Sequence, residues 1–272
     1  PLFFAPKNYY VLVYDFAYKY FFTGTLKESL KNRYTDFLTS ISFRRAKKIV
    51  SISNATRDEI VKFFKISRDK ITTIYLGWTT INDLEPEVFP NLPESYYMFI
   101  GTLKERKNVH RLLEAFAIFK KNNQNNCKLV IVGKKNISPY VKNLEKIIDE
   151  NSLQDDVIFT GHVTDNQVAY VYKNALALTF PSQLEGFGMP PLEAMSFDTP
   201  VITSSTTSLG EVAGDSAILV DPTNISEISD ALKRMRADDE LRAKLVEKGR
   251  ERIKAFSWDE SAELYNNLFL EK

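Results

Sequence analysis

The sequence predicts an α/β protein whose larger part is a doubly wound parallel sheet. Three observations predict this fold class. Short apolar runs alternate with helical patterns from residue 97 onward, glycine or polar residues follow most of these runs, and a proline-rich break separates them from an earlier, smaller set of alternating elements. Apolar strands that alternate with helices are typical of a parallel sheet covered on both faces.

Composition limits the class of protein further. At 272 residues, with 44% hydrophobic residues, the chain can form one large or two modest domains with buried cores. The single cysteine, Cys127, predicts no disulfide framework and a reducing compartment. No run reaches the roughly 20 apolar residues of a membrane span. The low cysteine count and the absence of such a run together favour the cytoplasm. Because the chain starts at Pro1 and no signal peptide precedes it, we expect a processed form or a fragment.

Residues 1–77 predict a small α/β unit with a basic surface. They hold 14 Lys and Arg against 6 Asp and Glu, whereas residues 78–272 are net acidic. The predicted elements are a buried strand at Tyr10–Tyr14, a basic helix at Leu26–Ala46, a strand at Lys48–Ser53, a helix capped by Asn54 or Thr56 that ends at Phe64, and a strand at Ile71–Leu76.

A linker is predicted at residues 78–96, because Asn82–Pro93 holds three prolines and shows no periodicity. After it, a second domain is predicted at 97–257, followed by a terminal helix at 258–272. Its strands are expected at 97–101, 128–133, 156–160, 175–180, 200–204 and 217–220, and its helices at 108–122, 138–151, 165–173, 190–197, 208–213, 225–236 and 238–254.

The segment Glu185–Glu193 is the most informative part of the chain. An apolar strand precedes it, and a helix with prolines in its first turn follows it. Gly186 and Gly188 allow a close backbone approach, and N–H groups at a helix start suit a phosphate. We place Glu185 at the entrance of the loop and Glu193 in the first helical turn, and both carboxylates can accept hydrogen bonds from hydroxyls. Phosphates and hydroxyls together indicate a sugar nucleotide; the alternative is an ordinary strand-to-helix turn.

Other polar groups also follow predicted strands, where a doubly wound sheet binds its ligands. Arg106 and Lys107 lie at a helix start, where an anionic diphosphate would offset their charge. The alternative is a solvated basic turn. Gly133-Lys134, Gly161-His162-Val163 and Ser204–Glu211 occupy three further strand ends. A purely structural loop histidine is the better interpretation of His162, and a simple cap could explain Ser204–Glu211.

From Tyr97 to Trp258 the chain resembles the nucleotide-sugar domain of the family 4 glycosyltransferases, which have the GT-B fold. The matching stretches are FIGTLKERKNVHRLLEAF, KLVIVGKK, VIFTGHVTD, LTFPSQLEGFGMPPLEAMSFDTPVITS and SLGEVAGDSAILVDP. The upstream stretch AKKIVSISNATRDEIVKFFKISRDKITTIYLG resembles the end of the family's N-terminal domain. The resemblance implies a complete C-terminal Rossmann-like domain, a partial N-terminal acceptor-side domain, and a terminal helix that crosses back to that N-terminal domain.

The resemblance also implies roles for individual residues. Arg106 and Lys107 would bind the donor diphosphate and stabilise the leaving nucleotide, Glu193 would bind the ribose, and Glu185 would bind the donor sugar beside the reacting centre. The remaining donor-site residues are Gly101, Lys134, His162, Val163, Gly186, Phe187, Gly188, Leu192, Tyr14 and Asp15. The implied reaction is hexose transfer with retention, from a UDP- or GDP-linked sugar to a glycan or lipid-linked acceptor, without a metal or other cofactor.

Three departures from the family pattern qualify this interpretation. Tyr14-Asp15 stands where the family usually has His-Asp, and Asp198 stands where it usually has Gly. Residues 1–77 are also too short for a whole N-terminal domain. A donor-binding module with impaired turnover is therefore the alternative function. A structural domain that has lost its ligand is disfavoured, because Arg106, Lys107, Glu185 and Glu193 are all intact. A nucleic-acid-binding protein is disfavoured because residues 78–272 are net acidic.

Basic residues 27–48 predict a second kind of contact. Arg33, Arg44, Arg45, Lys47 and Lys48 lie on or just after one helix, and cations near an anionic membrane favour peripheral binding at its inner face. A solvated helix face is the alternative.

Overall fold

The structure is a computed structural model that describes residues 9–21, 24–78, 85–122 and 126–270. The chain divides into two compact units. The N-terminal unit comprises Pro1–Gly77, Glu185–Phe187 and Phe256–Lys272, and the C-terminal unit comprises Trp78–Leu184 and Gly188–Ala255. Residues 79–84 of the predicted linker lie outside the described residues. Within the described part of the chain, no helix is both long and apolar enough to cross a membrane.

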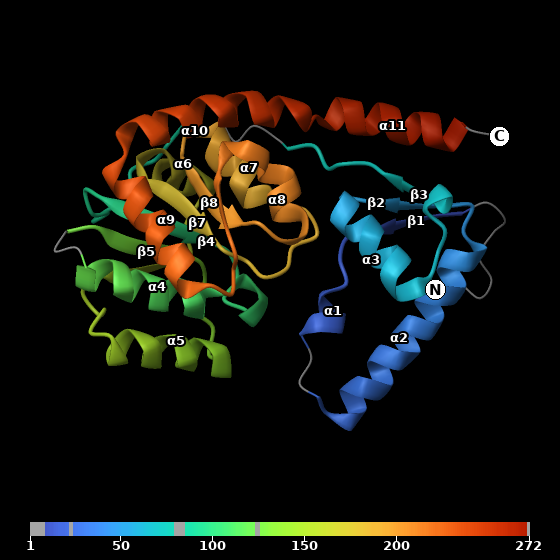
Figure 1. Ribbon diagram of the computed structural model, residues 1–272, viewed down its shortest axis with the longest axis horizontal. Coiled ribbons are helices and arrows are strands. Elements are labelled where there is room, and N and C mark those ends of the chain that lie inside the picture. Colours follow the sequence, from blue (N-terminus) through green and yellow to red (C-terminus); the bar gives the residue numbers. More distant parts are fainter. Residues whose placement is uncertain (1–8, 22–23, 79–84, 123–125, 271–272) are drawn as a thin grey trace. The chain divides into compact units, whose positions relative to one another are not determined.

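The C-terminal unit contains a six-stranded parallel sheet with the strand order β6-β5-β4-β7-β8-β9 (Figure 1). The strands are β4 (Tyr96–Ile100), β5 (Lys128–Val132), β6 (Val157–Gly161), β7 (Ala177–Phe180), β8 (Val201–Ser204) and β9 (Ile218–Val220). This is the strand order of the dinucleotide-binding fold, in which the direction of strand addition reverses between the two central strands. The predicted α/β class with a doubly wound parallel sheet is thereby confirmed.

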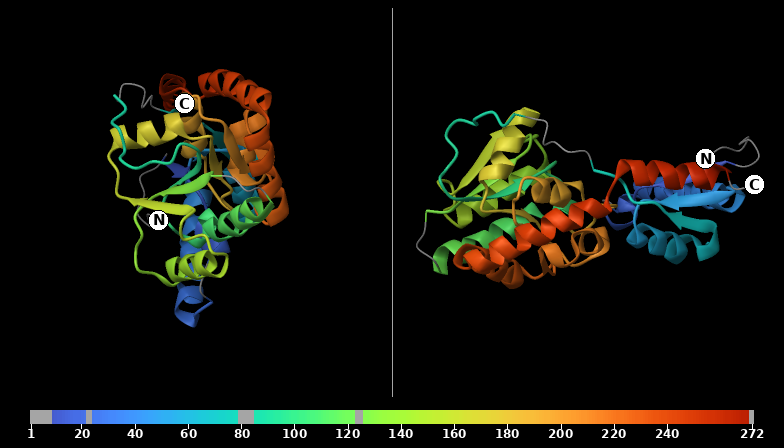
Figure 2. Two further views of the ribbon diagram at one scale, coloured as in Figure 1. Left: turned by 90° about the vertical axis from the view of Figure 1, so that its left-hand side faces the viewer. Right: turned by 90° about the horizontal axis from the view of Figure 1, so that it is seen from above.

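Helices cover both faces of this sheet. They are α4 (Val109–Asn122), α5 (Pro139–Glu150), α6 (Asp165–Asn174), α7 (Met189–Ser196), α8 (Thr207–Ala213), α9 (Ile225–Ala237) and α10 (Asp239–Arg252). In Figures 1 and 2, α4, α5 and α9 lie on one side, and α6, α7 and α8 on the other. Neighbouring residues of β4 reach opposite faces: Tyr96 donates to the carbonyl of Val171 on α6, and Tyr97 to that of Leu232 on α9. The period of two along a strand explains this alternation.

The N-terminal unit is built on a smaller parallel sheet. β1 (Tyr10–Val13), β2 (Lys48–Ser51) and β3 (Ile71–Thr73) pair in that order. The helices are α1 (Ala17–Tyr20), α2 (Leu26–Arg45), α3 (Asn54–Phe64) and α11 (Trp258–Leu270). Its core includes Phe16, Phe43, Ile49, Ile60 and Phe64.

Two sequence-based details of this unit are wrong. α3 is capped by Ser53, whose hydroxyl accepts a hydrogen bond from the Thr56 N–H, because Ser53 keeps the extended backbone that a cap requires. β1 is only partly buried. α11 packs against Tyr10, with ring centroids of Tyr10 and Phe269 4.9 Å apart, but Leu12 on the same strand face is 40% exposed.

Candidate functional site

The central feature of the C-terminal unit is the contact between the segments that follow β4 and β7. Arg106 donates from a guanidinium nitrogen to the carbonyl of Leu184 across 2.9 Å. In return, the Gln183 N–H and the Ser182 hydroxyl both donate to the carbonyl of Arg106, at 2.8 and 2.9 Å. β4 and β7 flank the reversal of strand order, and a doubly wound sheet binds ligands outside the carboxyl ends of its strands at this position.

Lys107 lies beside Arg106 but is almost buried. Its side chain is 9% exposed, and its ammonium group lies 4.8 Å from the ring centroid of Phe180, at the end of β7. Gly101 lies close by, since a Cβ built there would be 3.9 Å from Cε of Lys107. The two cations come just before α4, as predicted. They belong to a 3₁₀ turn, Glu105–Lys107, which precedes Asn108 and the first residue of α4.

Asn108 holds three strand ends together, a role the sequence interpretation missed. Its amide donates to the carbonyls of Pro181, after β7, and Pro222, after β9, at 2.9 and 2.6 Å. Its amide oxygen accepts from Arg111 at 2.9 Å and from Gln183 at 3.2 Å. The residue is fully buried with φ of 61°, a conformation that Asn tolerates better than most residues. An Asn directly after two cations in a strand-to-helix turn was the available signal.

Three glycines make the neighbouring strand ends closely spaced. A Cβ at Gly133, after β5, would lie 2.4 Å from the carbonyl oxygen of Gly101, after β4. Gly133 also forms a β-bridge with Gly161, at the end of β6. The predicted base-site residues follow these glycines: Lys134 and His162 are exposed, and Val163 is half-buried. All four strand ends from β6 to β7 therefore contribute to one edge of the unit.

α7 begins after Gly188, and its start is shaped by packing. Gly188 has φ of 123°, and a Cβ there would lie 2.8 Å from Cδ2 of Leu209 on α8. Pro190 and Pro191 follow in the first turn, as predicted, so they remove two of the N–H donors that a helix start offers. Leu192 is fully buried, so its side chain belongs to the core of the unit.

Glu193 is the fifth residue of α7 and lies beyond its first turn, which corrects the predicted position. Its Oε2 accepts a hydrogen bond from the hydroxyl of Tyr172 on α6 at 2.8 Å. Burial raises the pKa of Glu193, the Tyr172 hydroxyl opposes that shift, and Asp165 adds to it. The Tyr172 ring is fully buried and stacks on Phe197, with centroids 5.6 Å apart, so the carboxylate has a rigid support. No sequence signal had indicated Tyr172.

The remaining predicted residues belong to the N-terminal unit. A Cβ at Gly186 would lie 2.1 Å from the carbonyl oxygen of Tyr14, so Gly186 permits a close approach of two protein segments. The hydroxyl of Thr56 donates to that same carbonyl at 3.2 Å. The ring of Phe187 is buried against Tyr75 and Phe256, with centroids 6.2 and 5.6 Å away.

Tyr14, Asp15 and Glu185 are more accessible than Phe187. The Tyr14 side chain is 57% exposed. Asp15 is exposed, and its Oδ1 accepts a hydrogen bond from the Ala17 N–H at 3.0 Å, which fixes the start of α1. Glu185 is partly buried. Together with Gly186 and Phe187, these residues lie in one unit, whereas Arg106, Lys107 and Glu193 lie in the other.

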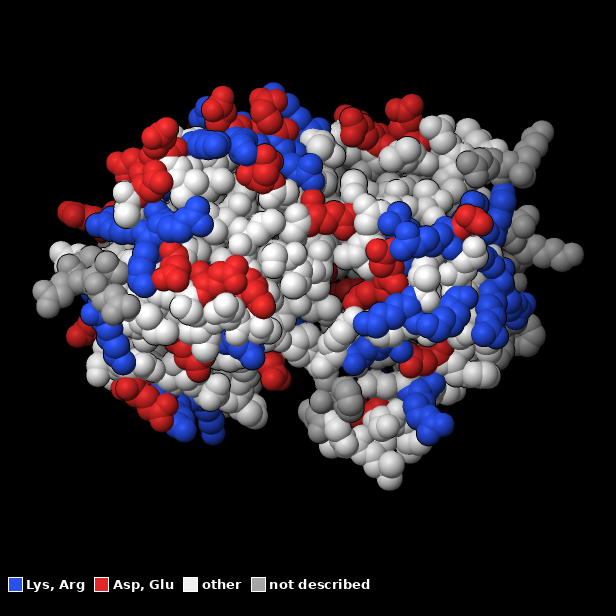
Figure 3. All heavy atoms as spheres, in the orientation of Figure 1, with Lys and Arg blue, Asp and Glu red and all other residues white. Residues whose placement is uncertain are grey.

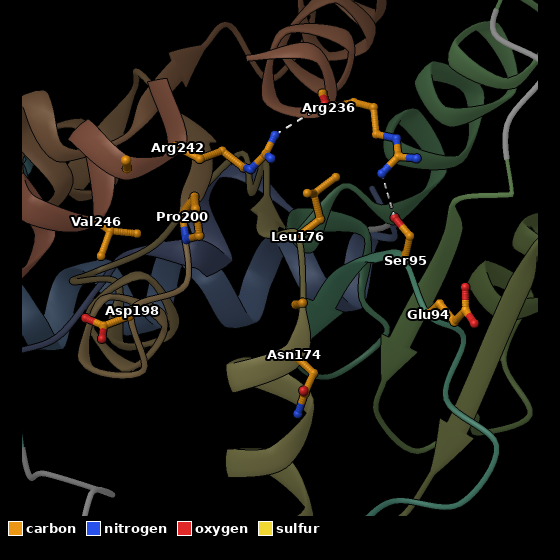
Figure 4. Close-up of a pocket in the computed structure, with 11 residues that line it drawn as sticks. Glu94, Ser95, Asn174, Leu176, Asp198, Pro200, Arg236, Arg242 and Val246 are labelled. Carbon is orange, nitrogen blue, oxygen red and sulfur yellow. Dashed lines mark hydrogen bonds between the residues drawn. The ribbon is translucent and has the colours of Figure 1, made fainter. Parts of the chain in front are cut away.

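A hollow of about 450 Å³ lies elsewhere in the C-terminal unit (Figure 4). It is lined by Ser95, Leu176 and Pro200, which directly precede β4, β7 and β8, so it lies at the amino ends of the strands. Its two arginines already serve the fold: Arg236 donates to the Ser95 hydroxyl at 3.0 Å, and Arg242 to the carbonyl of Met235 at 2.6 Å. This hollow is separate from the predicted site.

Comparison with known proteins identifies the family. The sequence model of the family "Glycosyl transferases group 1" matches residues 82–252, which is more than half of the chain. The chain belongs to the group 1 glycosyl transferases. Two curated members are similar: the O-antigen chain mannosyltransferase B of Escherichia coli, 31% identical over 84% of this chain, and the O-antigen chain mannosyltransferase RfbU of Salmonella typhimurium, 29% identical over 74%. The aligned regions cover 61% and 57% of those relatives, so this group 1 chain spans less than two thirds of their length.

Solved structures support the fold of this group 1 member. The sucrose-phosphate synthase of Thermosynechococcus elongatus aligns with a TM-score of 0.80 at 24% identity, covering 97% of this chain and 68% of that one. Anabaena HepE, solved in complex with UDP and glucose, aligns with a TM-score of 0.78 at 18% identity, covering 96% and 71%. The fold is therefore of the GT-B type, as predicted.

Proposed function

We propose that this chain carries the donor site of a retaining glycosyltransferase that moves a hexose from a nucleoside diphosphate sugar to a glycan or lipid-linked acceptor. Mannose is the leading candidate for the hexose and an O-antigen type polysaccharide for the product, because the two similar curated relatives are O-antigen mannosyltransferases. A GDP-linked donor is then the first one to test, with UDP-linked sugars as the alternative.

The observation that carries this proposal is the position of Arg106 at the reversal of strand order. The hydrogen bond to the Leu184 carbonyl orients its guanidinium next to the segment that leads into Glu185–Gly188. A cation held in place before the reaction can stabilise the negative charge that develops on the leaving diphosphate, without reorganisation at that moment. Lys107 would add a second positive charge, and Glu193 would hold the ribose hydroxyls through a carboxylate supported by Tyr172.

The other roles follow from the same assignment. Glu185 would bind hydroxyls of the donor sugar, and the backbones at Gly186, Gly188 and Leu192 would complete the sugar and phosphate site. Phe187 would act through packing. Gly101, Lys134, His162 and Val163 would line the base pocket at the β4, β5 and β6 ends. We propose that cationic side chains take the place of a metal, so chelation with EDTA should leave nucleotide binding and transfer unchanged.

The second candidate is a donor-binding module with impaired turnover. Tyr14 favours it, because a phenol can donate a hydrogen bond but does not change its charge near neutral pH as histidine does. Tyr14→His should raise the transfer rate if the tyrosine is the limiting feature. An unchanged rate would remove Tyr14 as the cause of any impairment.

Calorimetry with GDP and UDP tests the donor site directly. Arg106→Ala should weaken nucleotide binding by roughly 10- to 100-fold, which corresponds to the loss of a hydrogen bond to a charged group. Lys244→Ala, which removes an exposed cation from α10 in the same unit, is the matched control and should change nothing. No binding of either nucleotide by the parent chain, or equal losses in both variants, would contradict the proposed donor site.

A transfer assay then separates enzyme from binder. Sugar release or transfer from GDP-mannose, tested against UDP-linked sugars, would establish turnover. Glu185→Gln should chiefly lower the rate of transfer, whereas Glu193→Gln should chiefly weaken nucleotide binding. Equal effects of both substitutions on both quantities would refute the division of roles.

A further inference from the structure

The loop between β7 and α7 includes a short segment, Glu185–Phe187, that belongs to the N-terminal unit. Gly186 lies in the middle of this segment, and Gly188 follows it with φ of 123°. Because glycine restricts the backbone least, a loop with two glycines this close together has many accessible conformations. The position of Glu185 in the folded chain therefore depends on the groups that hold the residues next to it.

Phe187 is held by ring packing. Its side chain is buried against Tyr75 and Phe256, with centroids 6.2 and 5.6 Å away. The Asn54 amide at the start of α3 donates a hydrogen bond to the Tyr75 hydroxyl at 2.7 Å, which fixes the Tyr75 ring. Ring packing acts on the side chain of Phe187, however, and does not specify the direction of the Gly186 carbonyl.

The Gly186 carbonyl is held by a hydroxyl group on α3. Thr56 Oγ1 lies 3.2 Å from the carbonyl oxygen of Tyr14 and 3.5 Å from that of Gly186, so one O–H group donates to both. The Ser53 hydroxyl donates to Thr56 Oγ1 at 3.0 Å, which directs the Thr56 proton toward the two carbonyls. Thr56 is 2% exposed, so water does not compete for these hydrogen bonds.

Helix α3 gives this hydroxyl a rigid support. Its buried residues are Thr56, Ile60 and Phe64, which follow one another at intervals of four and therefore share one face. Ile60 and Phe64 belong to the core of the unit. The opposite face is solvated and basic: Lys62 is exposed, and Figure 3 shows Lys and Arg side chains gathered over α2 and α3. The core therefore fixes the rotation of α3, and with it the position of the Thr56 hydroxyl.

We propose that Thr56 is a positioning residue for the donor sugar. Its hydroxyl holds the Gly186 carbonyl beside the Tyr14 carbonyl, and so sets the place where the Glu185 carboxylate meets the sugar. This inference rests on the proposed function of Glu185. A group that binds a reacting sugar must be held closely, because a displacement of about 1 Å can lower a rate by about a hundredfold.

Calorimetry with GDP and GDP-mannose tests this role without requiring turnover, and UDP with UDP-glucose replaces them if UDP is the nucleotide that binds. The quantity compared is the ratio of the two dissociation constants, since it isolates the contacts with the sugar. Thr56→Val keeps the shape of the side chain but removes the hydroxyl, so it should weaken binding of the sugar nucleotide about tenfold and binding of the free nucleotide less than about twofold. Thr56→Ser keeps the hydroxyl and should restore the parent ratio. An unchanged ratio in Thr56→Val would overturn the proposal.

Thr203→Val is the matched control. Thr203 is fully buried on β8, and its hydroxyl also donates to a main-chain carbonyl, that of Phe180 at 2.9 Å. Both valine variants should have a lower melting temperature than the parent, because each leaves a buried carbonyl with one donor fewer. Only Thr56→Val should change the ratio of dissociation constants. Equal changes in the two variants would show a general loss of packing and would overturn the proposal.

A double substitution shows whether Thr56 acts through Glu185. The sugar contact is already weakened in Glu185→Gln, so adding Thr56→Val should change the ratio by less than about a further twofold. Full additivity would overturn the proposal, because Thr56 would then act on the sugar by another route.

Failure of the proposed function gives a different result. If the parent binds neither nucleotide nor its sugar conjugate, the proposed donor site is refuted and the role of Thr56 falls with it. If the parent binds and Thr56→Val leaves the ratio unchanged, only the role of Thr56 is refuted.

Discussion

The hydroxyl of Tyr172 donates a hydrogen bond to Oε2 of Glu193 across 2.8 Å, from a ring that is entirely buried. This pair joins α6 to α7 and holds a carboxylate in a place where burial disfavours its charge. Burial raises the pKa of Glu193, so keeping this group charged near neutral pH destabilises the unliganded fold. A ligand with hydroxyl groups would compensate for part of that loss.

Glu193→Gln should stabilise the unliganded chain at neutral pH while weakening nucleotide binding. The pKa of Glu193 is higher in the folded chain than in the unfolded chain. The folded state is therefore not penalised at a pH below the unfolded pKa, and its free energy of unfolding falls as the pH rises through the folded pKa. The difference in melting temperature between variant and parent should therefore be large at pH 7–8 and shrink toward pH 4. A difference that stays constant over this range would contradict the prediction.

His110 should make the C-terminal unit sensitive to acid. Burial, with a further contribution from Arg111, lowers the pKa of His110 to about 4, while its Nδ1 lies 3.1 Å from the Tyr140 hydroxyl. Since the folded pKa is below the unfolded one, the stability gained from neutral His110 is present above about pH 6.5 and is lost as pH falls toward 4. We expect the free energy of unfolding to fall less in His110→Asn than in the parent when the pH is lowered from 7 to 4.5. The difference between the two falls should be at most about 2 kcal/mol, because His110 is only partly buried. Parallel pH profiles would refute this.

Asn108 offers a test of backbone strain against hydrogen bonding. Both Asn108→Gly and Asn108→Ala remove the amide that binds the carbonyls of Pro181 and Pro222, so each should cost about 2–4 kcal/mol in urea unfolding. Alanine should cost about 1 kcal/mol more than glycine, because φ at this position is 61° and a Cβ is disfavoured there. Equal losses would mean that the left-handed conformation relaxes once the amide is gone.

Gly186→Ala should destabilise the N-terminal unit by about 2–3 kcal/mol or more, because its Cβ would meet the Tyr14 carbonyl oxygen at 2.1 Å. Gly24→Ala is the control in the same unit: its φ is 75°, but no atom lies within 4 Å of the new Cβ, so only a backbone strain of about 1 kcal/mol is expected. Amide exchange in β2 under native conditions measures both variants. A smaller effect at position 186 than at position 24 would show that the two segments separate readily.

Periodicity and strand ends were enough to predict the doubly wound sheet, because each strand of the C-terminal unit is an apolar run between helical patterns. The position of Arg106 and Lys107 after β4, at the carboxyl edge of the sheet, was also predictable, since residues that follow parallel strands share one edge. Tyr172 was not, because its hydroxyl meets Glu193 only through the packing of two helices, and nothing in its local sequence differs from a core tyrosine. Partners of this kind depend on tertiary contacts.

The departure at Asp198 has a similar explanation. Asp198 follows α7 with φ of 58°, a conformation that suits Gly, and it pairs with Arg250 through two contacts of 2.6 and 2.7 Å. This side-chain pairing lowers the pKa of Asp198. The sequence showed the unusual residue, but the compensating arginine lies 52 positions away and emerges only in the fold.

The close approach at Gly186 uses the backbone of Tyr14 and leaves its side chain 57% exposed. The packing at this place requires a glycine at position 186 and only the backbone of residue 14. The side chain at position 14 can therefore be exchanged with little effect on folding. A saturation library at position 14 would therefore vary the exposed side chain on a constant scaffold.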